Sequence, residues 1–132
     1  MNQILNIGKY LFPLSFLLYV GLHFGKPDVG AAMVPDYFPA PYFLNYLTAL
    51  FILLFIVSAL VGKFDKLAYT LMAVYVLLMA LLIHLPRSMG GQSETVMMNS
   101  ELEMVNVFRN IMVAGALMGF ARYVAKDNRI IG

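Results

Sequence analysis

The stretch Leu67–Arg87 reads LAYTLMAVYVLLMALLIHLPR and decides the fold of this chain. Tyrosine, threonine and histidine are its only interruptions before Pro86 and Arg87. A helix needs about 20 mostly apolar residues to cross the hydrocarbon core of a bilayer. We therefore expect residues 67–85 to cross a membrane as a helix. We expect Pro86 to end that helix, because proline has no backbone N–H to donate.

Three other stretches are also long and apolar, and we expect membrane spans at residues 5–24, 42–61 and 104–124. The last is the least apolar, and it can span only if Asn106, Arg109 and Asn110 lie at the outer boundary or inside the bundle. A cleaved signal peptide is an alternative interpretation of the first stretch. The sequence thus predicts one integral membrane domain over residues 1–132. Its fold class is all-α, a four-transmembrane-helix bundle with up-down topology and both termini on the same side.

The links between the spans carry turn and capping signals. Gly62 can end the second helix in a left-handed conformation. Asp65 is expected to be the N-cap of the third helix. Ser100 and Glu103 have the spacing of a capping box, which places the start of the fourth helix near residue 101.

The connector from Lys26 to Pro41 is rich in proline and in aromatic side chains. Its prolines prevent a continuous helix. Tyrosine is enriched where a membrane meets water. We therefore expect a short lid at the membrane surface between the first two spans.

The composition favours a membrane environment and excludes several classes of function. Charged residues make up 12% of the chain, against about 25% in a typical soluble domain. The net charge of +2 and the lack of a basic cluster do not favour nucleic acid as a partner. The chain has no cysteine, which removes disulfides and thiol chemistry. The expected partners are the lipid bilayer and either another membrane protein or a second copy of the chain.

Basic residues set the expected orientation. After four crossings both ends of the chain lie on one side, and that side carries more lysine and arginine than the other. Such an excess marks the cytoplasmic side. We therefore expect a multi-pass protein of the bacterial cytoplasmic (inner) membrane with cytoplasmic N- and C-termini. The basic residues beside the termini are Lys9, Lys63, Lys66, Arg122, Lys126 and Arg129, and those on the opposite side are Lys26, Arg87 and Arg109.

Both histidines of the chain, His23 and His84, lie near the outer ends of expected spans. The first and third helices of an up-down bundle run parallel, so we expect the two rings at the same end. Polar side chains at three- and four-residue steps share one face of the fourth helix, namely Asn99, Glu103, Asn106 and Asn110. These patterns predict an outward-facing polar cavity. Its candidate ligand-binding residues are Tyr19, His23, His84, Arg87, Glu103, Asn106, Arg109 and Asn110.

Several interpretations of this cavity stay open at this point. The polar groups can simply satisfy one another near the lipid headgroups. They can bind a quinone, a lipid headgroup or another small molecule, because histidine and asparagine hydrogen-bond to carbonyl groups. The two histidines can be axial ligands of a haem, or they can bind a metal ion together with Glu103. No catalytic motif is present, so we expect no independent catalytic activity.

Gly115 and Gly119 form a GxxxG pair in the fourth span. Small residues at this spacing let a second helix approach closely. The pair therefore predicts a helix-packing face, and it favours an alternative role as a membrane chaperone, assembly factor or scaffold.

Several motifs of the chain resemble the DoxX-like family of small membrane proteins. They are His23-Phe24, the connector Val34–Pro41, His84-Leu85-Pro86, and Asn110 with Gly115-Ala116-Leu117. The resemblance covers roughly residues 8–124. By position, the family-like residues are His23, Pro35, Pro39, His84, Pro86 and Asn110.

The resemblance implies a compact four-helix bundle in the cytoplasmic membrane. The family takes its name from a subunit of an archaeal thiosulfate:quinone oxidoreductase. Other members associate with membrane oxidative-stress complexes, and distant animal relatives assist receptor assembly in the endoplasmic reticulum. The expected function is therefore that of an accessory subunit in a membrane redox assembly linked to quinone. The absence of cysteine argues against a thiol-based redox role.

Overall fold

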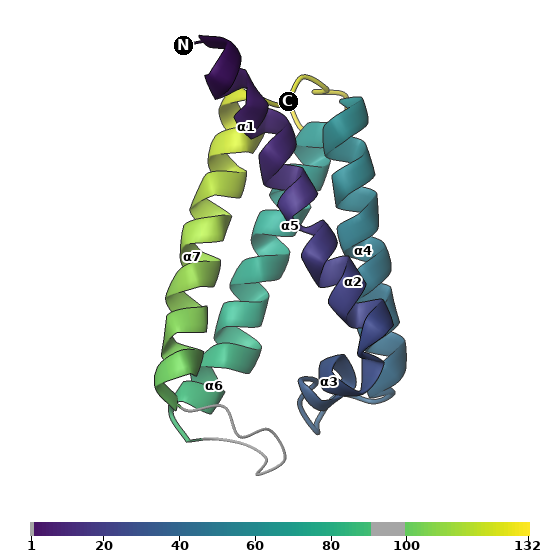
Figure 1. The fold of residues 1–132 in the computed structure, drawn as a ribbon, viewed down its shortest axis with the longest axis vertical. Helices are drawn as coiled ribbons and strands as arrows, with labels where there is room; N and C mark the ends of the chain where they lie inside the picture. Colours follow the sequence, from purple (N-terminus) through teal and green to yellow (C-terminus); the bar gives the residue numbers. More distant parts are fainter. Residues whose placement is uncertain (1, 91–99) are drawn as a thin grey trace.

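The computed structural model describes residues 2–90 and 100–132 and confirms an all-α four-helix bundle (Figure 1). The described residues contain four helical stretches that are long and apolar enough to cross a membrane, as in a multi-pass membrane protein. Both termini lie at one end of the bundle (Figure 1). The four stretches are Ile4–Gly25, Pro41–Val61, Asp65–Ser88 and Ser100–Tyr123.

The helices are named in chain order. The first span consists of α1 (Asn2–Ser15) and α2 (Leu17–Gly25), and the connector contains the short helix α3 (Pro27–Ala32). The second span is α4 (Pro41–Val61). The third combines α5 (Asp65–Met79), a π-helical turn η1 (Ala80–His84) and α6 (Leu85–Ser88), and the fourth is α7 (Ser100–Tyr123).

The first span is broken at Phe16, although the sequence predicted a single helix there. Pro13 lies inside α1, and the N–H of Phe16 donates to the carbonyl of Pro13 (3.2 Å) in a tight turn. This turn leaves the carbonyl of Phe12 without its usual helical donor. The hydroxyl of Ser15 donates to that carbonyl instead (2.6 Å), so the break leaves no unsatisfied acceptor at this point.

The expectation that Pro86 ends the third helix was wrong, because helical structure continues to Ser88. Pro86 cannot donate to the carbonyl of Leu82, four residues earlier. The π-helical turn η1 occupies this region, and the hydroxyl of Tyr37 donates to the Leu82 carbonyl (3.3 Å). π-Helical structure is rare and occurs mostly as single turns inside α-helices, as it does here. The connector thus supports the distorted end of the third span.

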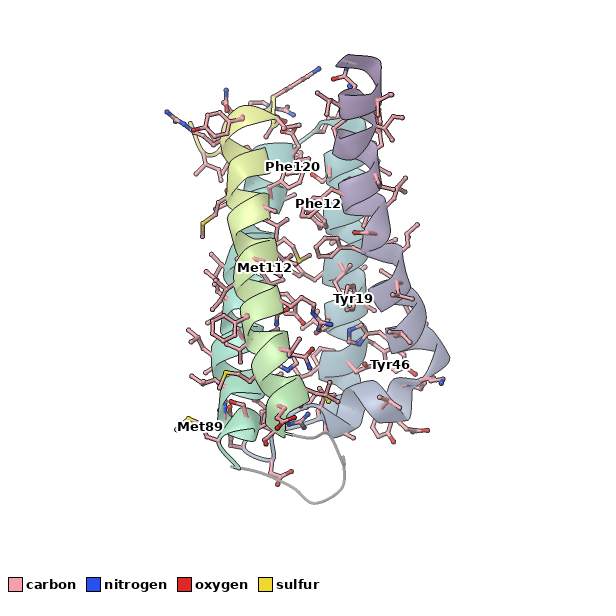
Figure 2. The ribbon with its side chains drawn as sticks, turned by 60° about the vertical axis from the view of Figure 1, so that its left-hand side comes forward. Phe12, Tyr19, Tyr46, Met89, Met112 and Phe120 are labelled. Atoms are coloured by element: carbon pink, nitrogen blue, oxygen red, sulfur yellow. The ribbon has the colours of Figure 1, made fainter. Side chains whose placement is uncertain are left out.

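Neighbouring helices pack in the order α2, α4, α5 and α7 around the bundle. As a result, α2 and the third span lie on a diagonal. An aromatic core fills the half of the bundle nearer the termini, where Phe12 stacks on Phe120 with ring centroids 4.6 Å apart. Figure 2 places these two rings together, with Tyr19 nearer the opposite end of the bundle. The aromatic core holds α1 against α7 only in this half.

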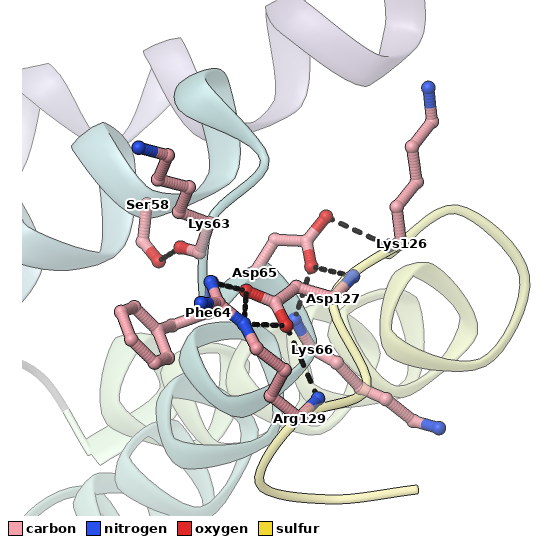
Figure 3. Close-up of polar contacts among 8 residues, drawn as sticks. All are labelled: Ser58, Lys63, Phe64, Asp65, Lys66, Lys126, Asp127 and Arg129. Carbon is pink, nitrogen blue, oxygen red and sulfur yellow. Dashed lines mark hydrogen bonds and ion pairs between the residues drawn. The ribbon is translucent and has the colours of Figure 1, made fainter.

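Gly62 ends α4 with a φ of 72°, which confirms the predicted left-handed cap. The N-cap assignment of Asp65 was wrong, because Phe64 occupies that position with a φ of 54° and Asp65 is the first residue of α5. The buried carboxylate of Asp65 accepts backbone N–H bonds from Lys66 (2.8 Å), Lys126 (2.9 Å) and Asp127 (2.9 Å). It therefore ties the C-terminal tail to the α4–α5 turn (Figure 3).

Asp127 completes this contact from the tail. Its carboxylate accepts from the N–H of Phe64 (2.7 Å) and pairs with the guanidinium of Arg129 (2.6 Å). The hydrogen bond from Arg129, followed by that from Phe64, holds the pKa of Asp127 well below its usual range. A lowered pKa in the folded state adds stability above the usual carboxyl pKa, and this stability is lost only as the pH falls toward the lowered value. The contribution of Asp127 to docking the tail therefore persists through neutral and mildly acidic pH.

We expect Asp65→Ala to release the tail and to lower the free energy of unfolding by about 2–3 kcal/mol, because three backbone N–H groups lose a charged acceptor. Trypsin cleavage after Lys126, followed by mass spectrometry, measures the release, and chemical denaturation in detergent measures the stability. Asp36→Ala is the control, since Asp36 is an exposed residue in the connector. An unchanged rate of cleavage at Lys126 in Asp65→Ala would contradict this description of the tail.

Candidate functional site

A cavity of about 520 Å³ occupies the half of the bundle away from the termini. Apolar side chains form most of its wall, including Ile52, Met72 and Val76. Among the predicted site residues, the cavity is lined by Tyr19, His23, His84, Asn106, Arg109 and Asn110. The structure thus brings these six residues from three different spans to a single space.

Arg87 and Glu103 were also predicted to line the cavity, but they lie behind its wall, where they contact His84 or its partners. Asn99, the first member of the predicted polar stripe on the fourth helix, lies outside the described residues. Lys26 and Tyr75 line the cavity as well.

The cavity opens sideways between α2 and α7. α2 packs on α3 and α4, whereas α7 packs on α5, η1 and α6. Tyr19 and Leu22, which line the cavity from α2, are 37% and 47% exposed. Arg109 lines it from α7 and is also exposed. The side chains that line the cavity from these two helices are therefore accessible from outside the bundle.

His23 forms hydrogen bonds with Asn45, a residue that the sequence analysis did not identify. The ring nitrogen Nδ1 of His23 lies 2.5 Å from Oδ1 of Asn45, and Nδ2 of Asn45 donates to the backbone carbonyl of His23 (2.9 Å). Asn45 is only 2% exposed. A buried amide in a membrane span is costly unless it is hydrogen-bonded, and here both ends of the amide group have a partner. A single asparagine within the apolar stretch 42–61 was the signal that could have identified it.

Gly30 of α3 makes room for this pair. A Cβ atom at position 30 would lie 1.8 Å from Oδ1 of Asn45 and 3.2 Å from Nδ1 of His23. Such a contact with Asn45 is far shorter than any van der Waals distance. The glycine therefore lets α3 cover the pair closely, and the connector takes part in building the site.

His84 is held by Glu103 on the other side of the cavity. Its Nδ1 lies 2.6 Å from Oε2 of Glu103, and Nδ2 of Asn106 donates to the same oxygen (3.4 Å). Glu103 is fully buried, and the guanidinium of Arg87 lies 3.7 Å from its other oxygen, Oε1. The predicted capping box is therefore wrong for Glu103, whose carboxylate faces His84 rather than the start of α7. The helix itself begins at Ser100.

Arg87 also joins this network to the connector. Its guanidinium donates to the backbone carbonyl of Ala32 (3.0 Å) and contacts the sulfur of Met33 (2.6 Å). Oε1 of Glu103 has no hydrogen-bond partner among the described residues, so Arg87 is the nearest charge that balances it. The guanidinium thus links the end of α3 to the buried carboxylate of α7.

The metal alternative gains no support from the described residues, which contain no group of three or more histidine, cysteine or acidic side chains placed to hold a metal ion. His84 contacts Glu103, whereas His23 contacts Asn45. The three side chains that the metal hypothesis needs are therefore not gathered around one point.

The predicted packing role of Gly115 and Gly119 is not fulfilled within the described part of the chain. A Cβ atom at either position would meet nothing within 4 Å. The close approach that the spacing predicts therefore stays a prediction for contact with another polypeptide.

Comparisons with protein-family models, with curated proteins and with solved structures found no match. The resemblance to the DoxX-like family thus rests on the motifs of the sequence.

We expect Gly30→Ala to destabilise the protein by about 1–3 kcal/mol, because the added methyl group must displace Asn45 from His23. Thermal unfolding in detergent measures the effect. Gly21→Ala is the matched control, since a Cβ there meets nothing within 4 Å and alanine favours a helix. Equal melting temperatures for the two variants would contradict the close packing of α3 against Asn45 and His23.

Proposed function

We propose that the protein binds a quinone or a similar membrane-soluble molecule with a polar ring or headgroup, as an accessory subunit of a membrane redox assembly. The single observation that carries this proposal is the cavity. Its volume of about 520 Å³ falls in the usual range for small-molecule sites. Its wall is mainly apolar, with a few polar groups that converge on the interior, which is the usual composition of such sites.

The polar groups suit a ring that carries oxygen atoms. Arg109 and Asn110 of α7 can donate hydrogen bonds, while His23 and His84 line the cavity from the other two spans. Tyr19 and Tyr75 provide aromatic surface near them. The lateral opening between α2 and α7 gives an apolar tail a path to the lipid, which favours a ligand delivered by the membrane over one delivered by water.

An accessory role follows from what this site offers. The site can hold and orient such a ligand, and the oxidant or reductant would come from a partner protein. This role agrees with the resemblance to the DoxX-like family. The excess of basic residues beside the termini favours the bacterial cytoplasmic membrane, with cytoplasmic termini and the cavity near the outer surface.

We expect mass spectrometry of the protein, purified from its native membrane in mild detergent, to detect a bound quinone or lipid. Val113→Trp should abolish this binding, because Val113 lines the cavity and the larger ring fills it. Val105→Trp is the matched control on the same helix, since Val105 is 60% exposed on the outer surface. Recovery of no such molecule, or equal amounts from both variants, would overturn the proposal.

A further inference from the structure

The contacts with Asn45 decide which nitrogen of the neutral His23 ring carries the proton. Because Nδ2 of Asn45 donates to the backbone carbonyl of His23, Oδ1 must be the atom that faces the ring. Turning the amide over would place two carbonyl oxygens against each other. Oδ1 can only accept, so Nδ1 of His23 carries the proton. In the neutral ring, Nε2 is then a bare acceptor.

His84 is in the same state for a different reason. Oε2 of Glu103 accepts from Nδ1 of His84, and the nearby guanidinium of Arg87 balances the charge of the carboxylate. In the neutral ring the proton therefore lies on Nδ1, and Nε2 is the nitrogen that can accept a hydrogen bond.

The two rings lie on diagonally opposite helices and line the same cavity. With Nδ1 engaged in each ring, the histidines offer the cavity two acceptors. Arg109 and Asn110 offer it donors. A ligand that carries hydroxyl groups on its ring can thus meet acceptors from two different spans in the same cavity.

We infer that the cavity prefers the hydroquinone form of its ligand over the quinone form, an inference that rests on the proposed function. The donors Arg109 and Asn110 can serve either form, because the oxygen atoms of both forms accept hydrogen bonds. The bare Nε2 atoms do discriminate, because only the hydroxyl groups of a hydroquinone can donate to them. A quinone carbonyl beside a bare Nε2 places two acceptors together and leaves both unsatisfied.

The test compares the two forms on the full chain in phosphatidylcholine nanodiscs under anaerobic conditions. Equilibrium dialysis with a short-tailed p-benzoquinone and with its hydroquinone gives the two dissociation constants. We expect the hydroquinone to bind at least about tenfold more tightly, because it forms one or two hydrogen bonds that the quinone cannot form. A tenfold preference raises the midpoint potential of the bound two-electron couple by about 30 mV, which a redox titration measures independently.

His23→Gln and His84→Gln test the assignment, because glutamine offers both a donor and an acceptor and should bring the ratio of the two constants toward one. Tyr46→Phe is the control, since Tyr46 is exposed on α4 outside the cavity. If a histidine variant does not fold, the ratio for the unchanged protein and its redox titration decide the question.

The outcomes are distinct. Equal affinities, or tighter binding of the quinone, would overturn the preference and leave the proposed function standing. A preference that persists in both histidine variants would overturn its assignment to these rings. Binding of neither form would overturn the preference and the quinone proposal together.

Discussion

The buried carboxylate of Glu103 is the constraint on which the half of the bundle away from the termini depends. A carboxylate inside a membrane protein is costly unless charges and hydrogen bonds compensate it. Here His84 comes from the π-helical turn, Arg87 from α6 and Asn106 from the next turn of α7. The irregular end of the third span is therefore the means by which a ring and a guanidinium both reach the same carboxylate. A straight helix that stopped at Pro86 would not place Arg87 there.

A second pair, His23 with Asn45, repeats this arrangement across the cavity with neutral groups. In both cases an oxygen atom hydrogen-bonds to Nδ1 of the ring, and this contact fixes the orientation of the ring. Supporting hydrogen bonds that fix the orientation of a binding side chain preorganise it and reduce the entropy lost when a ligand binds. The connector contributes to both pairs. Gly30 covers the pair of His23 and Asn45, and the carbonyl of Ala32 accepts a hydrogen bond from Arg87, which contacts Glu103.

The two halves of the bundle have different roles. Near the termini, Phe12 and Phe120 stack, and the buried Asp65 fastens the C-terminal tail, so this end is closely packed. Beyond Phe16 the first span turns away from α7, and the cavity opens in the space between them. The break at Phe16 thus separates the closely packed end of the bundle from the end that contains the cavity.

Apolar length alone was enough to predict the four membrane spans and their up-down order, and Gly62 marked one helix end correctly. The sequence also indicated that His23, His84 and Asn110 would meet, because helical periodicity and topology place them at one end. It could not identify Asn45, since one amide in an apolar span does not reveal its partner. Nor could it foresee that helical structure would pass Pro86, because the supporting hydroxyl of Tyr37 comes from a distant segment.

The most direct measurement of the central claim is nitrogen NMR of the two histidines, labelled with ¹⁵N, in the full chain in nanodiscs at neutral pH. Resonances assigned with His23→Gln and His84→Gln report which nitrogen of each ring carries the proton. We expect a proton on Nδ1 and a bare Nε2 in both rings, and a shift of both Nε2 resonances when hydroquinone is added. A proton on Nε2 with a bare Nδ1 in either ring would contradict this expectation.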